Sequence, residues 1–225
     1  MHELGHSLTG ILLKFKVNRI ELYPYGGCSK LEYNINTTII KEFLVLAMGP
    51  IMQIVFVYII KLSTLSVPDY FYTYHYFILI FNLLPIFPLD GGRLLQLIFF
   101  LFFSYYYSYK YIIYFSYFLY LLLFLYFAFF SWNLLIFLIL ILLGFQIYIE
   151  IHKVDFYFDK FLIERYLYDY NFSKNKTIFD IKQMKRDYYH YFIDNGKYID
   201  ERQMLKKYFG LDYSIKEKYK KQDNY

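Results

Sequence analysis

Long stretches without charge constrain this chain more than any other feature of its sequence. Residues 43–60, 111–130 and 134–149 are apolar and contain no Asp, Glu, Lys or Arg. A helix needs about 20 predominantly apolar residues to cross the hydrocarbon core of a bilayer. Each stretch therefore predicts a membrane-spanning helix, and we expect an all-α polytopic membrane protein with the lipid bilayer as a partner.

Charge is concentrated in the last third of the chain. Residues 1–150 contain 8 Lys and Arg with 7 Asp and Glu, whereas residues 151–225 contain 16 and 12. We therefore expect an intramembrane core over residues 1–152 and a small cytoplasmic region over residues 153–225. The formal net charge of +5 gives no reason to expect a nucleic-acid partner, and the single Cys28 excludes an intrachain disulfide,.

The chain begins with two histidines at helical spacing. His2 and His6 stand at positions i and i+4, so on a helix they lie on the same face,. Two imidazoles placed in this way can hold one zinc ion, and Glu3 beside them can act as the general base of a metalloprotease. The motif alone is weak evidence, because a helix can carry two unrelated histidines. This helix is too short to span a bilayer.

A single aspartate lies inside the apolar region of residues 71–109. Asp90 follows Pro85 and Pro88, which each remove a backbone donor and interrupt a helix,. Irregular backbone at membrane depth is tolerated only where it is buried in protein or faces a wet cavity. A charged side chain there costs roughly 2.5–3.5 kcal/mol on insertion scales and marks a functional candidate. His2, His6 and Asp90 are therefore the predicted ligands of a catalytic zinc site with an open fourth position.

A purely structural alternative would pair Asp90 and Glu3 with Arg93, Lys14 or backbone amides. That alternative leaves the spacing of the two histidines unexplained. Asn82 and Gly91 are predicted to support the interrupted backbone or to contact a substrate. His75 and His190 are expected to be ordinary polar or core histidines.

Residues 18–23 and 29–33 alternate polar and apolar side chains on either side of a Pro24–Gly27 turn. This pattern predicts a β-hairpin at the membrane surface. One interpretation is a simple connection between helices, and the other is an exposed edge that pairs with an extended substrate segment.

The basic residues predict the orientation in the membrane. Loop 14–42, Lys110 and the tail are expected on the cytoplasmic side, because basic residues accumulate there,. Loop 61–70 and the Trp132-Asn133 turn are then expected on the outside.

Helix boundaries can also be predicted. The apolar pattern after residue 92 continues to about Tyr109, so an interruption is expected at Lys110. In the tail, Asn195-Gly196 indicates a turn before a charged helix at 201–209. Two sets of tail residues have helical apolar spacing: Phe158, Phe161, Leu162 and Tyr166, and then Met184, Tyr188 and Tyr191.

Taken together, the motifs resemble the site-2 protease family of intramembrane zinc metalloproteases. Residues 2–6 match the first family motif, residues 82–93 match the second, and Gly49-Pro50 stands where the family has its glycine-proline helix. Residues 22–27 and 161–166 more narrowly resemble the stage IV sporulation protein FB branch. The resemblance covers about residues 1–167.

The resemblance implies regulated intramembrane proteolysis with Zn²⁺, acting on a membrane-tethered or single-pass protein. A regulatory membrane protein is a further implied partner. In the sporulation branch, the substrate is the membrane-tethered precursor of a mother-cell sigma factor.

The chain departs from the family pattern in three respects. Gln53 stands where many members carry asparagine, and the tail is too weakly patterned to be assigned to a nucleotide-sensing CBS domain. In the family, a first transmembrane helix and the front of a second come before the motif that stands here at residues 2–6, and the sequence given does not include them. Because Met1 abuts His2, we expect this sequence to be a truncated reading of a longer protein. The competing hypothesis is a catalytically inactive membrane scaffold.

Overall fold

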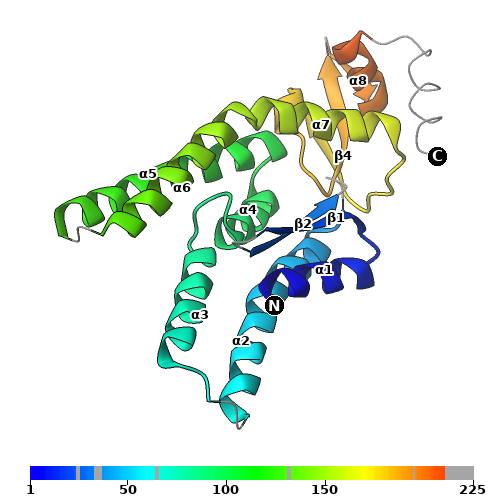
Figure 1. The fold of residues 1–225 in the computed structure, drawn as a ribbon. Helices are drawn as coiled ribbons and strands as arrows, with labels where there is room; N and C mark the ends of the chain where they lie inside the picture. The colour runs from blue at the N-terminus through cyan, green and yellow to red at the C-terminus, as the bar shows by residue number, and fades with distance from the viewer. Residues whose placement is uncertain (24–25, 33–36, 64–65, 131–132, 195, 211–225) are drawn as a thin grey trace.

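The computed structural model describes residues 1–23, 26–32, 37–63, 66–130, 133–194 and 196–210, and between 16 and 32 the backbone alone. Most of these residues are helical (Figure 1). The helices are α1 (His2–Leu12), α2 (Ile39–Leu62), α3 (Asp69–Asn82), α4 (Asp90–Phe102), α5 (Tyr105–Phe130), α6 (Leu134–His152), α7 (Val154–Leu167) and α8 (Glu201–Phe209). The strands are β1 (Lys16–Tyr23), β2 (Gly26–Glu32), β3 (Asn175–Ile178), β4 (Tyr189–Asp194) and β5 (Lys197–Asp200), with a 3₁₀ helix η1 (Ile181–Gln183).

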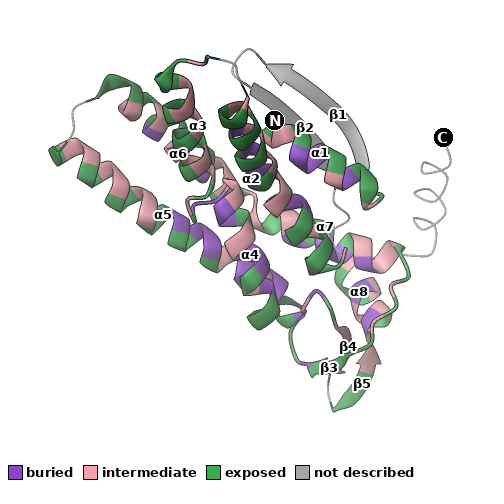
Figure 2. Ribbon diagram, turned by 90° about the horizontal axis from the view of Figure 1, so that it is seen from below, coloured by how far each residue is buried: buried purple, intermediate pink, exposed green. Residues whose placement is uncertain are grey.

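Helices α2, α5 and α6 are long and apolar enough to cross a membrane, which confirms the three predicted spans. Their outer faces carry large exposed apolar side chains such as Ile54, Tyr126 and Leu142. Figure 2 shows the exposed residues along these faces, while the buried residues gather where the helices meet. Such faces suit lipid, because acyl chains are as apolar as the side chains that they contact.

Strands β1 and β2 pair antiparallel, from Lys16 opposite Glu32 to Tyr23 opposite Gly26. The predicted hairpin is thus confirmed, with a bulge between Val17 and Arg19. The predicted turn residues Pro24 and Tyr25 lie outside the described residues, as does Trp132 of the predicted outer turn.

The predicted interruption at Lys110 is wrong. The chain breaks between α4 and α5 at Ser104, and Lys110 lies within α5. Ser104 Oγ donates to Lys182 O over 2.7 Å, and Tyr105 N donates to Met184 O over 2.9 Å. The η1 segment of the tail therefore supplies acceptors at the break, which the local apolar pattern cannot indicate.

The second predicted helix of the tail is also wrong. Residues 189–194 form strand β4, which pairs parallel with β3 and antiparallel with β5. On β4, His190 and Phe192 are fully buried, whereas Tyr191 between them is 38% exposed. This is the alternation of a strand, in which successive side chains point to opposite faces. The helical spacing of Met184, Tyr188 and Tyr191 is coincidental.

The other tail predictions agree with the structure. Helix α7 contains the first set of helically spaced residues, and α8 has the predicted bounds. Gly196, next to the β4–β5 turn, has a φ of 76°, a left-handed conformation that glycine adopts without strain,. Asn195 lies outside the described residues.

The tail packs directly against one end of the membrane helices α2 and α5. Phe161 of α7 is fully buried and stacks on Tyr105 of α5, with ring centroids 4.3 Å apart. Arg186 forms an ion pair with Glu42 in the first turn of α2 and donates to Thr37 O over 2.6 Å. The Glu42 carboxylate outweighs the effect of burial and raises the pKa of Arg186 above its ordinary value. One hydrophobic core thus joins the two predicted regions.

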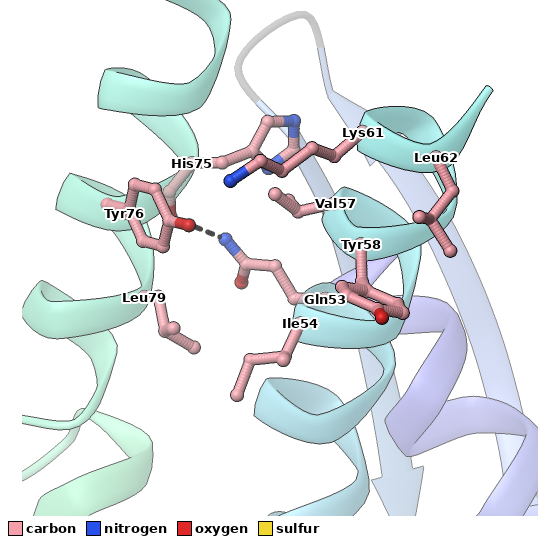
Figure 3. Close-up of a pocket in the computed structure, with 9 residues that line it drawn as sticks. All are labelled: Gln53, Ile54, Val57, Tyr58, Lys61, Leu62, His75, Tyr76 and Leu79. Atoms are coloured by element: carbon pink, nitrogen blue, oxygen red, sulfur yellow. Dashed lines mark hydrogen bonds between the residues drawn. The ribbon is translucent and has the colours of Figure 1, made fainter. Parts of the chain in front are cut away.

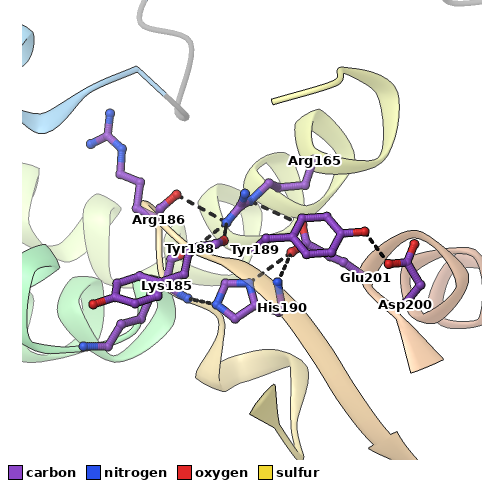
Figure 4. Close-up of polar contacts among 8 residues, drawn as sticks. All are labelled: Arg165, Lys185, Arg186, Tyr188, Tyr189, His190, Asp200 and Glu201. Atoms are coloured by element: carbon purple, nitrogen blue, oxygen red, sulfur yellow. Dashed lines mark hydrogen bonds and ion pairs between the residues drawn. The ribbon is translucent and has the colours of Figure 1, made fainter. Parts of the chain in front are cut away.

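Buried polar and charged side chains also contact one another within the tail (Figure 4). His190 Nδ1 lies 3.0 Å from Glu201 Oε2, and its Nε2 accepts from Lys185 N over 3.0 Å. Burial lowers the pKa of His190 and that of Arg165, the latter to about 10. Arg165 Nη2 donates to Lys185 O over 2.8 Å and to Tyr188 O over 2.7 Å. Because Nε2 of His190 accepts a hydrogen bond from Lys185 N, it carries no proton, and His190 is a neutral core histidine.

Candidate metal centre

Two glycines let α1 lie directly on α2. A Cβ added to Gly5 would fall 2.3 Å from Met48 O, and one added to Gly49 would fall 2.2 Å from His6 Nε2. Only glycine permits so close an approach of backbone to backbone and of backbone to ring. The face of α2 that carries Gly49 is therefore the surface that receives α1, and His6 is held against Gly49.

The turn between α3 and α4 places Asp90 opposite these histidines. A Cβ on Gly91 would fall 2.2 Å from Leu83 O, and one on Gly92 would fall 2.4 Å from Phe87 N. The turn is therefore folded tightly against the first residues of α4. Phe87 N donates to Ser116 Oγ of α5 over 2.8 Å, which satisfies an amide of the irregular backbone inside the predicted membrane region,.

His2, His6 and Asp90 converge on one point. The Asp90 Oδ2 atom lies 2.7 Å from His2 Nε2 and 3.2 Å from His6 Nε2, and the two Nε2 atoms are 3.1 Å apart. The side chains are 11%, 8% and 18% exposed in that order. Within the described part of the chain, this is the cluster of three or more His, Cys, Asp or Glu whose geometry could hold a metal ion.

The Nδ1 atom of each imidazole, which does not face Asp90, lies at hydrogen-bond distance from an oxygen of α2. His6 Nδ1 lies 2.8 Å from Val45 O, and His2 Nδ1 lies 3.0 Å from Gln53 Oε1. A carbonyl oxygen only accepts hydrogen bonds, so Nδ1 of His6 carries the ring proton. Its Nε2 then presents a lone pair towards Asp90.

The donor set fits a zinc ion. Two imidazole nitrogens and one carboxylate oxygen, all within 3.2 Å of one another, are acceptors that repel one another without a positive charge between them,. Two histidines and one carboxylate are also a known set of protein ligands in catalytic zinc sites. Among the described residues, the ionisable groups that lie against the Asp90 carboxylate are the two imidazoles, and not the cations of the structural alternative.

The other residues predicted to take part, Glu3, Gly91 and Asn82, lie near His2 or Asp90 in the sequence. Glu3 is half-buried on α1 beside His2, and Gly91 is in the first turn of α4. Asn82 is the last residue of α3, at the start of the turn that leads to Asp90.

Sequence reasoning missed Val45 and Gln53, which contact the Nδ1 atoms of the two histidines. Val45 acts through its backbone carbonyl, which no side-chain pattern reveals. Gln53 did leave a signal, because it is the most polar side chain in the apolar residues 43–60.

Gln53 also lies at a pocket between α2 and α3 with a volume of about 320 Å³ (Figure 3). His75 lines this pocket and is not one of the converging groups. The full lining is Gln53, Ile54, Val57, Tyr58, Lys61, Leu62, His75, Tyr76 and Leu79.

Comparison with known proteins finds relatives that match part of the chain. No protein-family model matches the chain. Stage IV sporulation protein FB of Bacillus subtilis is 37% identical over 105 residues, which are 44% of this chain and 36% of that protein. A Synechocystis protein named "Putative zinc metalloprotease sll0528" is 31% identical over 104 residues, 42% of this chain and 27% of that protein.

The aligned part thus spans little more than a third of the first relative and about a quarter of the second. Over this shared part, the chain is homologous to members of the site-2 protease family, as its motifs predicted.

Proposed function

We propose that this chain is the core of an intramembrane zinc metalloprotease that cleaves a membrane-tethered or single-pass protein in or near the bilayer. The convergence of three acceptor atoms from His2, His6 and Asp90 carries the proposal. The helices long and apolar enough to span a membrane and the names of the two relatives support it. A membrane-tethered sigma-factor precursor is the first substrate to test, because one relative is a sporulation protein.

The residues divide the chemistry between them. His2, His6 and Asp90 would hold the metal, which when bound polarises a peptide carbonyl and acidifies water. Glu3 takes a proton from the attacking water and delivers it to the leaving amine. The substrate has to be locally unwound, because a helix hides its carbonyls in hydrogen bonds. The β1–β2 hairpin packs beside α1, so its edge is one place where an extended segment could pair,.

Co-expression with tagged single-pass proteins tests this function. We expect cleavage of at least one membrane-tethered substrate, its loss on treatment with a membrane-permeant zinc chelator, and its recovery on adding zinc. Cleavage that persists at full rate without zinc contradicts the proposal. A catalytically inactive scaffold predicts no cleavage of any substrate and no zinc in the purified protein.

The proposed orientation can be tested by cysteine labelling in a Cys28→Ser background. Ser66 lies in the predicted outer loop and Lys197 in the tail, and both are exposed. We expect an impermeant thiol reagent on intact cells to label Ser66→Cys but not Lys197→Cys, which should react only after lysis. Labelling at 197 and not at 66 would reverse the orientation.

A further inference from the structure

We propose that Gln53 is a positioning residue that fixes the tautomer and orientation of the His2 ring, an inference that rests on the proposed metal centre. Gln53 lies on α2, and only 3% of its surface is exposed. Its amide makes two hydrogen bonds, one to α1 and one to α3. A buried amide in a membrane helix is costly unless it is hydrogen-bonded, so both contacts contribute to its placement.

The contact with α3 determines which way the amide faces. Gln53 Nε2 donates to His75 O over 2.8 Å. If the amide were turned over, its oxygen would face the His75 carbonyl oxygen, and two acceptors would meet. The nitrogen therefore faces α3, as Figure 3 shows, and the oxygen faces His2.

The amide orientation in turn determines the state of His2. Because Oε1 only accepts, the His2 Nδ1 atom 3.0 Å away carries the ring proton,. The Nε2 atom, 2.7 Å from Asp90 Oδ2, then offers its lone pair to the centre. Partners that fix a ligating histidine from behind typically change metal affinity by about 10–100-fold when they are removed.

The two histidines differ in how this support is supplied. His6 is held by the backbone carbonyl of Val45, which a substitution leaves in place. His2 depends on a side chain, so its support can be removed by changing one residue. Gln53 also links α3 to the metal centre, because the same amide bonds to both.

Metal titrations of the purified full chain in detergent test the proposal. In Gln53→Met the side chain keeps nearly its volume but loses the acceptor, and we expect zinc and cobalt to bind about 10–100-fold more weakly. In Gln53→Glu an oxygen acceptor remains for His2 Nδ1–H while the amide donor to His75 O is lost. We expect this variant at pH 8 to bind within about threefold of the original chain, with a similar cobalt absorption spectrum.

The Gln53→Glu variant distinguishes a role of Gln53 in positioning the His2 ring from a role in packing α2 against α3. If Gln53 only joined α2 to α3, both variants would lose that contact and weaken metal binding equally, which would overturn the inference. Gln146→Met is the matched control, because Gln146 is an exposed residue of the membrane helix α6, and its metal affinity should not change. Unchanged affinity in Gln53→Met would also overturn the inference. If the original chain binds no metal, the proposed function itself fails.

Discussion

Glu3→Gln is expected to reduce peptide cleavage by at least about 10²–10⁴-fold while leaving about one zinc bound per chain. Glutamine has the same shape as glutamate but cannot take a proton from water. The converging atoms belong to His2, His6 and Asp90, so the substitution leaves the metal ligands in place. Substrate cleavage and elemental analysis of the same preparation measure the two effects.

Substitution of a ligand should have a different result. His2→Ala or Asp90→Ala removes one of the three converging groups, so zinc and cleavage are expected to be lost together,. Full cleavage in the Glu3→Gln variant would exclude Glu3 as the base. Loss of zinc in that variant would instead make Glu3 part of the ligand set.

Gly49→Ala is expected to disable the centre without changing any polar group. The added methyl would fall 2.2 Å from Nε2 and 2.3 Å from Cε1 of His6. The ring is already held by Val45 O at 2.8 Å, so the ring or α1 has to move away from Gly49, which changes the position of Nε2 relative to the other two groups. We expect zinc affinity to fall by about 10–100-fold or more, with overpacking that costs about 1–3 kcal/mol. Zinc titration and thermal unfolding measure these effects.

Gly144→Ala is the matched control for this change. A Cβ there would fall 2.5 Å from the hydroxyl of Tyr120, which is the far end of a side chain that can rotate aside. Zinc affinity and cleavage should therefore stay close to those of the original chain. If Gly49→Ala also behaves in this way, then α1 does not pack on α2 as closely as the structure shows.

The membrane helices and the three candidate ligands were predictable because their signals are local or specific to residue type. An apolar run predicts a span from its own length, as residues 43–60 do for α2. An imidazole pair at helical spacing and a lone Asp90 predict a metal because few other roles require them. The roles of Gly5 and Gln53 depend on which helices meet, and a single sequence does not contain that information directly.

The two wrong predictions, the interruption at Lys110 and the second helix of the tail, also concern structure that depends on contacts between distant parts of the chain. The break at Ser104 is stabilised by backbone acceptors about 80 residues later in the chain. Strand β4 pairs with β3 and β5, and its two partners determine its structure more than the spacing of its own apolar residues,. Local periodicity predicted a helix there because three residues happened to match.

The zinc content and zinc-edge X-ray absorption of the purified chain test most directly whether His2, His6 and Asp90 form a metal site. We expect about one zinc per chain, with nitrogen and oxygen ligands at about 2.0–2.2 Å and no sulfur at about 2.3 Å. The signal should be unchanged in Cys28→Ser and lost in His6→Ala. A chain that takes up no zinc, or one that holds it through sulfur, would contradict the proposed centre.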